Sequence, residues 1–564
     1  PRYPWRATWW LTLGISLLYL VPLTPLWTPG GDSEFFVSAA RSIVRGEGYR
    51  FNGGPVAIAP PAWPLLLAGV FQISPTFLAA KLVNILCLAG AWLLAHRVLL
   101  RLMPTRIATT AVLLSAILNV AYPLTFWLHS DPLFCLVAWT ACLSAVRLAE
   151  DAGRRVDWAV LLLASALLPV VRYAALIQMG ITMALLLGGW NRHRKRTIAA
   201  VLAVGVATAA SFKATEVGLA WHASSLQVAT QPDEWPATPT LAESQTASVL
   251  SNGPATERSW LADRTLRVAQ ASRWPAWLLV YPMRFASAIA LAAWIPLVVG
   301  LVVMAAIATA TRWRQWQLTV WPAVLIYILL LAFVWPLPNA RYLVPVAPLV
   351  IGGVLLGLQR LEPRRFAKPL TLFFVGVVGT INAGMYVVDV VVQRIPNYYA
   401  HYEGGQVASL IAACDYMNEV GVGDREVAIS ERYDNLGAMR FLKTSSRQAV
   451  LLLDREVIIV PDVYSFPPGE VPEKTRQLAR VNDGGFRPWA AGKGFRWYLY
   501  QQPVRPWRLW HFEVPAWLQN AVARDDDDAP ARTNGWKLWS SDDGFEVPIE
   551  LPDRRARITR VPGL

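Results

Sequence analysis

The stretch TWWLTLGISLLYLVPLTPL, residues 8–26, carries no charged side chain and is long enough to cross the hydrocarbon core of a bilayer as a helix. Comparable apolar stretches recur along the chain of 564 residues, of which 55% are hydrophobic and 16% are charged. This composition is typical of a protein with several membrane-spanning helices, and it excludes an intrinsically disordered chain.

Eleven apolar segments are predicted as membrane spans. They cover roughly residues 8–26, 76–96, 107–121, 132–149, 158–171, 173–190, 197–213, 285–310, 317–335, 342–358 and 369–391. Two of them, 107–121 and 158–171, are shorter than the usual span of about 17–25 residues. With the N-terminus placed inside, the inner connections contain 18 Lys and Arg residues, whereas the short outer connections contain only Arg172 and Arg341. Basic residues are enriched on the cytoplasmic side, so this alternation supports both short spans and a polytopic α-helical membrane protein.

Three longer regions then face outward, namely residues 27–75, 214–284 and 392–564. The last region contains no spanning segment. Its strand-like stretches are EVAIS (426–430), AVLLL (449–453) and EVIIV (456–460), and VASLIAACDYMNEV (407–420) is helix-like. We therefore expect a membrane module over residues 1–391, with outer loops 27–75 and 214–284, and a soluble α/β-type domain outside the membrane over residues 392–564.

The net charge of +14 does not indicate nucleic-acid binding, because the basic residues lie in small clusters between apolar segments. Three of the four cysteines lie within apolar segments, so neither a disulfide framework nor a Cys-x-x-Cys metal site is predicted. The sequence also lacks a P-loop, GxGxxG, HExxH or GxSxG motif. Any chemistry must therefore come from isolated polar residues.

Several ionisable residues map to the outer ends of the predicted spans or to the outer loops. They are Asp32, Glu34, His129, Asp131, Arg172, Lys213 and Arg341. Ionisable groups at such positions are costly unless they are paired, hydrated or functional, and the rest of the spans contain few of them. Their gathering at one membrane face predicts a functional site there.

The stretch EFFVSAARSIVR, residues 34–45, has the spacing of an amphipathic helix that lies along the outer membrane interface. Asp32 precedes this helix, and two interpretations of it remain open. Its carboxylate can cap the helix N-terminus, where it satisfies unpaired N–H groups and the helix dipole. Alternatively, it can take a proton from the hydroxyl group of an acceptor.

An Asp-x-Glu sequence at residues 32–34 is followed by APPAWPLLLAG (59–69), HSDPLF (129–134) and NARYLVPVAP (339–348). In this order and on this side of the membrane, the stretches resemble the GT-C superfamily of integral-membrane glycosyltransferases. Within it, the likeness is to the bacterial branch related to protein O-mannosyltransferases and the lipid A aminoarabinose transferase, with an RgtA/B/C/D-like domain. The resemblance extends over roughly residues 1–390.

The resemblance implies an inverting hexosyl- or pentosyltransferase that takes a sugar from a polyprenyl-phosphate carrier. The acceptor would be a glycan, lipid or protein on the outer face of a bacterial inner (plasma) membrane. By the family pattern, Asp32 is the general base, Glu34 positions the acceptor or orients Asp32, and Arg341 binds the donor phosphate. A guanidinium suits that task, because it stays charged and can bind phosphate through two parallel N–H donors. Arg172 and Lys213 are further candidates for phosphate binding.

The remaining candidates are also consistent with structural roles. Asp131 precedes Pro132, so capping the following helix alone would explain it. His129 and Tyr342 are candidates for contacting the acceptor or shaping the site, although His129 beside Trp127 is also typical of an interfacial side chain. Lys213 and the arginines could extend toward lipid headgroups instead, and the arginines could also pair with a nearby acid.

We expect no required metal. Asp32, Glu34, His129 and Asp131 could together collect a divalent cation, but the arginines can neutralise a monophosphate leaving group without one. The expected partners are the lipid-linked sugar donor, the acceptor and the bilayer, with no nucleic acid. The alternative function is a transporter or flippase for lipid-linked sugars, which should show related halves or ionisable residues near the middle of its helices. A non-catalytic scaffold would leave the charged residues without a purpose.

Overall fold

The computed structural model describes the chain in several stretches. They are residues 5–29, 32–56, 59–151, 154–226, 317–334, 340–360, 365–392, 406–424, 426–431, 444–455, 457–461, 496–501, 536–540 and 558–564, with 278–279, 300 and 303. The predicted span 285–310 lies outside the described residues except at 300 and 303, as does most of the outer loop 214–284.

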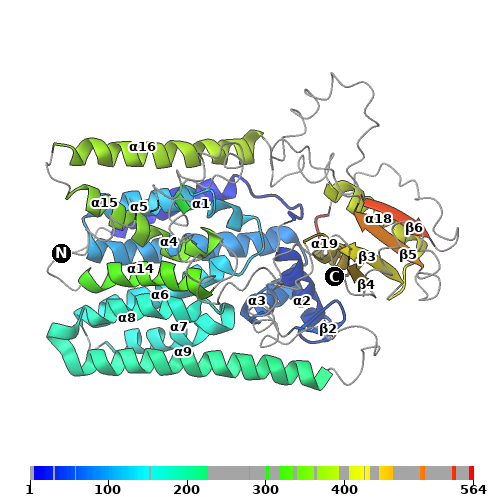
Figure 1. Ribbon diagram of the computed structural model, residues 1–564, viewed down its shortest axis with the longest axis horizontal. Helices are drawn as coiled ribbons and strands as arrows, with labels where there is room; N and C mark the ends of the chain where they lie inside the picture. The colour runs from blue at the N-terminus through cyan, green and yellow to red at the C-terminus, as the bar shows by residue number, and fades with distance from the viewer. Residues whose placement is uncertain are drawn as a thin grey trace, which may run out of the picture.

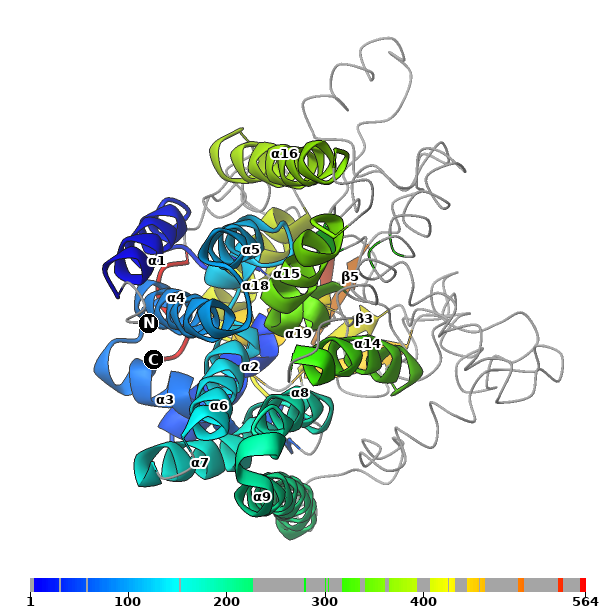
Figure 2. The ribbon, with the colours of Figure 1, turned by 90° about the vertical axis from the view of Figure 1, so that its left-hand side faces the viewer.

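A bundle of helices with nearly parallel axes makes up one end of the molecule (Figures 1 and 2). Its members are α1 (Trp5–Leu20), α4 (Phe77–Leu102), α5 (Thr105–Ile117), α6 (Asp131–Glu150), α7 (Arg155–Val171), α8 (Ala175–Leu187), α9 (Trp190–Leu226), α14 (Gln317–Val334), α15 (Ala347–Leu358) and α16 (Ala367–Tyr386). Each coincides with a predicted apolar segment. Among the described residues, five helical stretches are long and apolar enough to cross a membrane. The chain is a multi-pass membrane protein.

Polar side chains of different helices pair inside the bundle, and apolar side chains are exposed on its outside. The Trp92 indole donates to the Tyr19 hydroxyl (2.7 Å), which donates to the carbonyl oxygen of Ala116 (2.9 Å). By contrast, Trp10 is 71% exposed and Leu86 70% exposed. An arrangement with paired polar groups inside and apolar side chains outside suits a lipid environment, where an unpaired polar group has no water to bind. Helix α9 also continues past residue 213, where the sequence suggests an outer loop, as far as Leu226.

Between this bundle and a small sheet lie α2 (Ser33–Val44), the hairpin of β1 (Arg50–Phe51) and β2 (Gly54–Pro55), and α3 (Ala62–Ile73) (Figure 1). The structure buries the polar as well as the apolar side of α2, which its amphipathic spacing does not predict, and its position along the membrane interface stays a prediction. Every residue from Ser33 to Ser42 is buried. The polar side of α2 is covered by chain segments that are remote in sequence, which helical periodicity cannot reveal.

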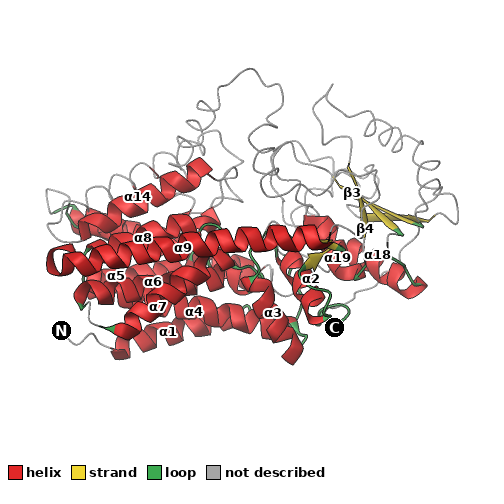
Figure 3. Cartoon of the chain, turned by 90° about the horizontal axis from the view of Figure 1, so that it is seen from below, coloured by secondary structure: helices red, strands yellow, loops and turns green. Residues whose placement is uncertain are grey.

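The strands of the sheet are confined to the other end of the molecule (Figure 3). The sheet has the order β4 (Val457–Pro461), β3 (Val427–Glu431), β5 (Trp497–Gln501) and β6 (Trp536–Ser540). Strand β3 runs parallel to β4 and β5, and β6 is antiparallel to β5. Helices α18 (Gln406–Val420) and α19 (Thr444–Leu453) accompany it. The strands predicted at 426–430 and 456–460 and the helix at 407–420 are therefore confirmed.

The stretch AVLLL (449–453) was interpreted as strand-like, and this is wrong, because it forms the last turns of α19. A short apolar run has no periodicity that separates a buried strand from a buried helix. In the structure, its side chains join a core that also contains Phe35 and Val37 of α2 and Met417 of α18. This core connects the segment between α1 and α4 to the region after residue 405.

Glycine 189, between α8 and α9, lies where the backbone of α6 comes close. A Cβ atom added there would be 2.9 Å from the Cα atom of Ala149 and 3.1 Å from its carbonyl oxygen. We expect Gly189→Ala to destabilise the bundle by about 1–3 kcal/mol through overpacking. Gly180→Ala in α8 is the matched control, because no heavy atom lies within 4 Å of its added Cβ. Thermal unfolding in detergent should show a lower midpoint for Gly189→Ala alone; equal midpoints would contradict the close approach.

Candidate functional site

Six of the predicted site residues come together beside the start of α2. Around them lie the start of α6, the end of α7 and the segment directly before α15. The six residues are Asp32, His129, Asp131, Arg172, Arg341 and Tyr342, here called the charged cluster. Its members come from segments as far as 309 residues apart in sequence. No sequence spacing could have predicted which of them meet.

Asp32 immediately precedes α2, and its carbonyl oxygen accepts the first helical hydrogen bond, from the N–H of Phe36 (3.1 Å). Its side chain, however, makes no capping hydrogen bond to the helix. The carboxylate instead accepts a hydrogen bond from Nη2 of Arg341 (2.8 Å) through Oδ2, and the side chain remains 39% exposed. The interpretation of Asp32 as a side-chain cap is therefore wrong, and its carboxylate is directed into the charged cluster.

Arg341 lies in the short 3-10 helix η4 (Ala340–Val346), directly before α15. Its Nη1 donates to Nδ1 of His129 (3.1 Å). A guanidinium has no acceptor, so Nδ1 must be the unprotonated ring nitrogen, and a neutral His129 carries its proton on Nε2. The Tyr342 ring lies close to both arginines, with its centroid 5.2 Å from Cζ of Arg172 and 5.4 Å from Cζ of Arg341, within the range of a cation–π contact.

Asp131 is the first residue of α6, where the cap position is taken by Ser130, and no side-chain capping hydrogen bond is made. The predicted capping role of Asp131 is therefore wrong. Its carboxylate forms an ion pair with Nη1 of Arg172 (2.5 Å), and both side chains are largely buried. Oδ2 of Asp131 also lies 3.9 Å from Nε of Arg341. Two carboxylates and two guanidiniums thus alternate through the charged cluster, and their formal charges cancel.

The structure does not bring Lys213 into the charged cluster. Lys213 is 70% exposed on α9 and pairs with Glu216 (2.7 Å), three residues along the same helix. Glu34 is fully buried in the first turn of α2. Among the described residues, no three His, Cys, Asp or Glu side chains are grouped closely enough to hold a metal ion.

Two residues of α4 support the loops that carry the charged cluster, and the sequence analysis missed both. Lys81 is 1% exposed, and its ammonium group donates to the carbonyl oxygens of Thr24 (3.3 Å) and Leu26 (2.6 Å) and to the Thr28 hydroxyl (2.8 Å). It thereby fixes the connection from α1 toward Asp32. The only sequence signal was a lysine inside the apolar segment 76–96.

Asn84, three residues later on α4, donates to the carbonyl oxygens of Leu124 (3.0 Å) and Trp127 (2.6 Å). It fixes the segment that leads from the 3-10 helix η1 (Tyr122–Thr125) to His129. A further buried acid, Asp389 in the π-helical turn η5 (Val387–Val392), accepts a hydrogen bond from Tyr122. The predicted spans therefore contain more ionisable groups than expected, namely Lys81 and Asp389, and both lie near helix ends.

No protein-family model matches the chain, and no curated protein matches its sequence. Among solved structures, ArnT from Cupriavidus metallidurans bound to undecaprenyl phosphate is 13% identical, with 88% of this chain and 93% of that chain covered and a TM-score of 0.50. The chain has the GT-C fold. The oligosaccharyltransferase of Archaeoglobus fulgidus is 11% identical over 88% of this chain and 70% of that chain, with a TM-score of 0.49. The fold expected from the four short stretches is thus confirmed, and the charged cluster lies at one end of the GT-C helix bundle.

The ion pair between Asp131 and Arg172 should contribute to stability independently of any chemistry. Arg172→Met would leave the buried Asp131 with a more distant guanidinium as its remaining partner. Removing one member of a buried ion pair costs roughly 3–5 kcal/mol. The matched control is Lys213→Met, which breaks an exposed pair worth less than about 1 kcal/mol. Thermal unfolding should therefore show a clear loss for Arg172→Met only; equal losses would mean that the buried pair adds no stability.

Proposed function

We propose that the protein is an inverting membrane glycosyltransferase that moves a sugar from a polyprenyl-phosphate carrier to an acceptor hydroxyl on the outer membrane face. The observation that carries the proposal is the direct pairing of Asp32 with Arg341 in the charged cluster. A proton acceptor and a phosphate-binding cation lie within one hydrogen bond of each other, at the end of an apolar bundle. The GT-C fold supports it, and ArnT, which shares that fold, has been crystallised with undecaprenyl phosphate.

In the proposed reaction, the acceptor oxygen attacks the anomeric carbon of the sugar while the bond from that carbon to the phosphate oxygen breaks. The acceptor proton passes to Asp32, and the polyprenyl phosphate leaves with the bonding electron pair. One displacement inverts the anomeric centre. Arg341 stabilises the negative charge that develops on the leaving phosphate, which is where fixed cations lower a barrier most.

The geometry distinguishes the two acids. Asp32 is 39% exposed and so is accessible to an acceptor, whereas Asp131 is nearly fully buried and already paired with Arg172. We therefore assign the general base to Asp32. Asp131 is assigned to holding the two arginines in place. Glu34 is fully buried, which favours a role in orienting Asp32 over contact with the acceptor.

In the protein without substrate, Arg341 is already paired with Asp32, so we expect the donor to bind before Asp32 takes the acceptor proton. The donor phosphate competes with Asp32 for the guanidinium of Arg341. When the phosphate takes that guanidinium, the hydrogen bond from Arg341 to Asp32 breaks, and Asp32 can accept a proton from the acceptor. His129 and Tyr342 would limit the movement of Arg341, because both contact it.

The proposed setting is a bacterial inner membrane with eleven spans, the charged cluster on the outer side, and residues 392–564 as a soluble domain on that side. The acceptor is a glycan, lipid or protein. A transporter of lipid-linked sugars is the second candidate. The described ionisable residues favour the transferase, because Lys81 and Asp389 lie near helix ends, whereas a transporter binds its cargo near the middle of its helices.

Asp32→Asn tests the assignment of the base. The amide keeps the shape of the side chain but cannot accept the acceptor proton, so we expect the transfer rate to fall by about 10²–10⁴-fold. The assay uses purified protein in nanodiscs with a panel of radiolabelled polyprenyl-phosphate sugars and membrane extract as acceptor. Lys213→Gln is the control and should keep the wild-type rate. Normal turnover by Asp32→Asn would refute the base assignment; no transfer from any donor, with a folded wild type, would direct attention to lipid flipping.

Removal of divalent cations tests the proposal that no metal is required. In the proposed reaction Asp32 becomes neutral when it takes the acceptor proton, so the charge of Arg341 can then neutralise the phosphate, while Arg172 stays paired with Asp131. We expect the same transfer rate before and after treatment with EDTA followed by gel filtration. Loss of transfer that Mg²⁺ or Mn²⁺ restores would contradict this and would favour a diphosphate-linked donor.

A further inference from the structure

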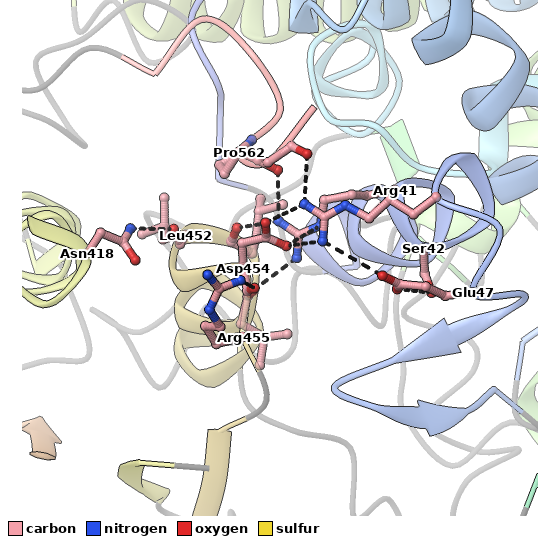
Figure 4. A network of polar contacts seen from close by, with 12 residues as sticks. Arg41, Ser42, Glu47, Asn418, Leu452, Asp454, Arg455 and Pro562 are labelled. Atoms are coloured by element: carbon pink, nitrogen blue, oxygen red, sulfur yellow. Dashed lines mark hydrogen bonds and ion pairs between the residues drawn. The ribbon is translucent and has the colours of Figure 1, made fainter. Parts of the chain in front are cut away.

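The second half of α2 docks onto a surface made by α19 and by the segment 558–564 (Figure 4). Segment 558–564 also pairs with the outer end of the bundle. Thr76 and Arg560 form an antiparallel bridge, and the N–H of Trp27 donates to the carbonyl oxygen of Ile558 (2.7 Å). Two segments that lie more than 400 residues later in the chain therefore pack against the polar side of α2.

Arg41 is the centre of this contact and is 5% exposed. Its guanidinium donates to the carbonyl oxygens of Leu451 (2.9 Å) and Val450 (3.3 Å) in the last turn of α19, and to that of Pro562 (3.0 Å). The last carbonyl groups of a helix lack partners within the helix and carry its partial negative charge. Arg41 thus caps α19 from a different helix, and a cation is the favoured residue there.

Asp454 completes the contact directly after α19, with a positive φ of 56°. Its carboxylate pairs with Nε of Arg41 (3.1 Å) and with Arg45, which in turn donates to the carbonyl oxygen of Gly563 (2.7 Å). Burial lowers the pKa of Arg41 to about 10, while Asp454 opposes the shift. Arg41 is therefore cationic at neutral pH and interacts with both the helix end and the carboxylate.

The hairpin that follows α2 makes an independent contact with the same region. Asn52 lies in the β1–β2 turn, and its side chain donates to the carbonyl oxygen of Val457 (2.9 Å) and accepts from the N–H of Val457 (2.8 Å). It thereby satisfies both backbone groups of the first residue of β4. The outer loop 27–75 is held to the α19–β4 unit at two places.

Arg41 acts on Asp32 through α2. The two residues are nine positions apart, which is roughly 14 Å along a helix at about 1.5 Å per residue. Asp32 is tied to the start of α2 by its backbone hydrogen bond to Phe36. A tilt of α2 would therefore move the Asp32 carboxylate relative to Arg341, which belongs to the membrane bundle.

We propose that Arg41 is a positioning residue for transfer: by capping α19 it fixes the direction of α2 and so holds Asp32 at Arg341. The inference rests on the proposed function of Asp32. It makes α19 and the segment 558–564 necessary parts of the transferase and not only a platform for the acceptor.

The test compares Arg41→Met, Arg41→Lys and Arg455→Gln in the full chain in nanodiscs. Arg455 is the matched control, because it lies beside Asp454 but bonds only to the carbonyl oxygens of Val422 (3.4 Å) and Asp454 (3.0 Å), away from α2. We expect Arg41→Met to lower the single-turnover transfer rate by at least about 10-fold, since misplacing a reacting group by about 1 Å can cost 10²-fold. Arg41→Lys should recover part of the rate, and Arg455→Gln should match wild type.

Donor-binding capacity separates positioning from a merely structural role. Arg341 still binds the phosphate when Asp32 is displaced, so Arg41→Met should bind as much donor per protein as wild type while transferring slowly. A capacity that falls in proportion to the rate would show loss of folded protein and overturn the proposal, as would a wild-type rate. If Arg41→Met does not fold, donor-binding capacity and transfer rate are compared in Asp454→Asn and Arg41→Lys instead.

Hydrogen–deuterium exchange gives a readout that does not need activity. Exchange of the backbone amides in residues 33–44 should rise in Arg41→Met and stay unchanged in Arg455→Gln. A rise confined to residues 444–455 would overturn the proposal, because α2 would then be held without Arg41. If the wild type transfers no sugar at all, the function proposed for Asp32 fails, and the exchange data still decide whether Arg41 fixes α2.

Discussion

The alternation of two carboxylates and two guanidiniums at the end of the helix bundle is the arrangement on which the rest of the site depends. A charge near the hydrocarbon region is costly alone, but each of these four has an opposite charge within 4 Å. The pairing offsets the cost of placing Asp32 and Arg341 at the site where the proposed reaction needs a proton acceptor and a phosphate-binding group. Because the pairs join separate segments, they also draw the start of α2, the start of α6, the end of α7 and η4 together.

Hydrogen bonds from two side chains of α4 hold the loops that carry this arrangement. Lys81 and Asn84 lie one turn apart on α4. Lys81 donates to a carbonyl oxygen of the segment that leads to Asp32, and Asn84 donates to one of the segment that leads to His129. A buried ammonium group with three oxygen acceptors is tolerable, because all its donors are used. Both donors lie on a helix of the bundle, so the bundle fixes the conformation of the loops.

Because α2 is buried, it connects the segment between α1 and α4 with the region after residue 405. Helix α2 is covered on its apolar side by α3 and the surrounding core and on its polar side by α19 and segment 558–564. Through α2, the proposed role of Arg41 links the region after residue 405 to the position of Asp32.

The sequence by itself determined the helical bundle and the kinds of side chain available at the end where the charged cluster lies. Backbone groups in lipid must bond within their own helix, so the spans have a set length and an apolar composition that can be recognised one segment at a time. Interpretation failed where a segment depends on distant partners: Asp32 and Asp131 look like helix caps, and AVLLL looks like a strand. Only the tertiary structure decided that each acid meets an arginine and that Arg41 meets the end of α19. Ion pairs and caps depend on distances between atoms, and those distances arise when segments hundreds of residues apart pack together.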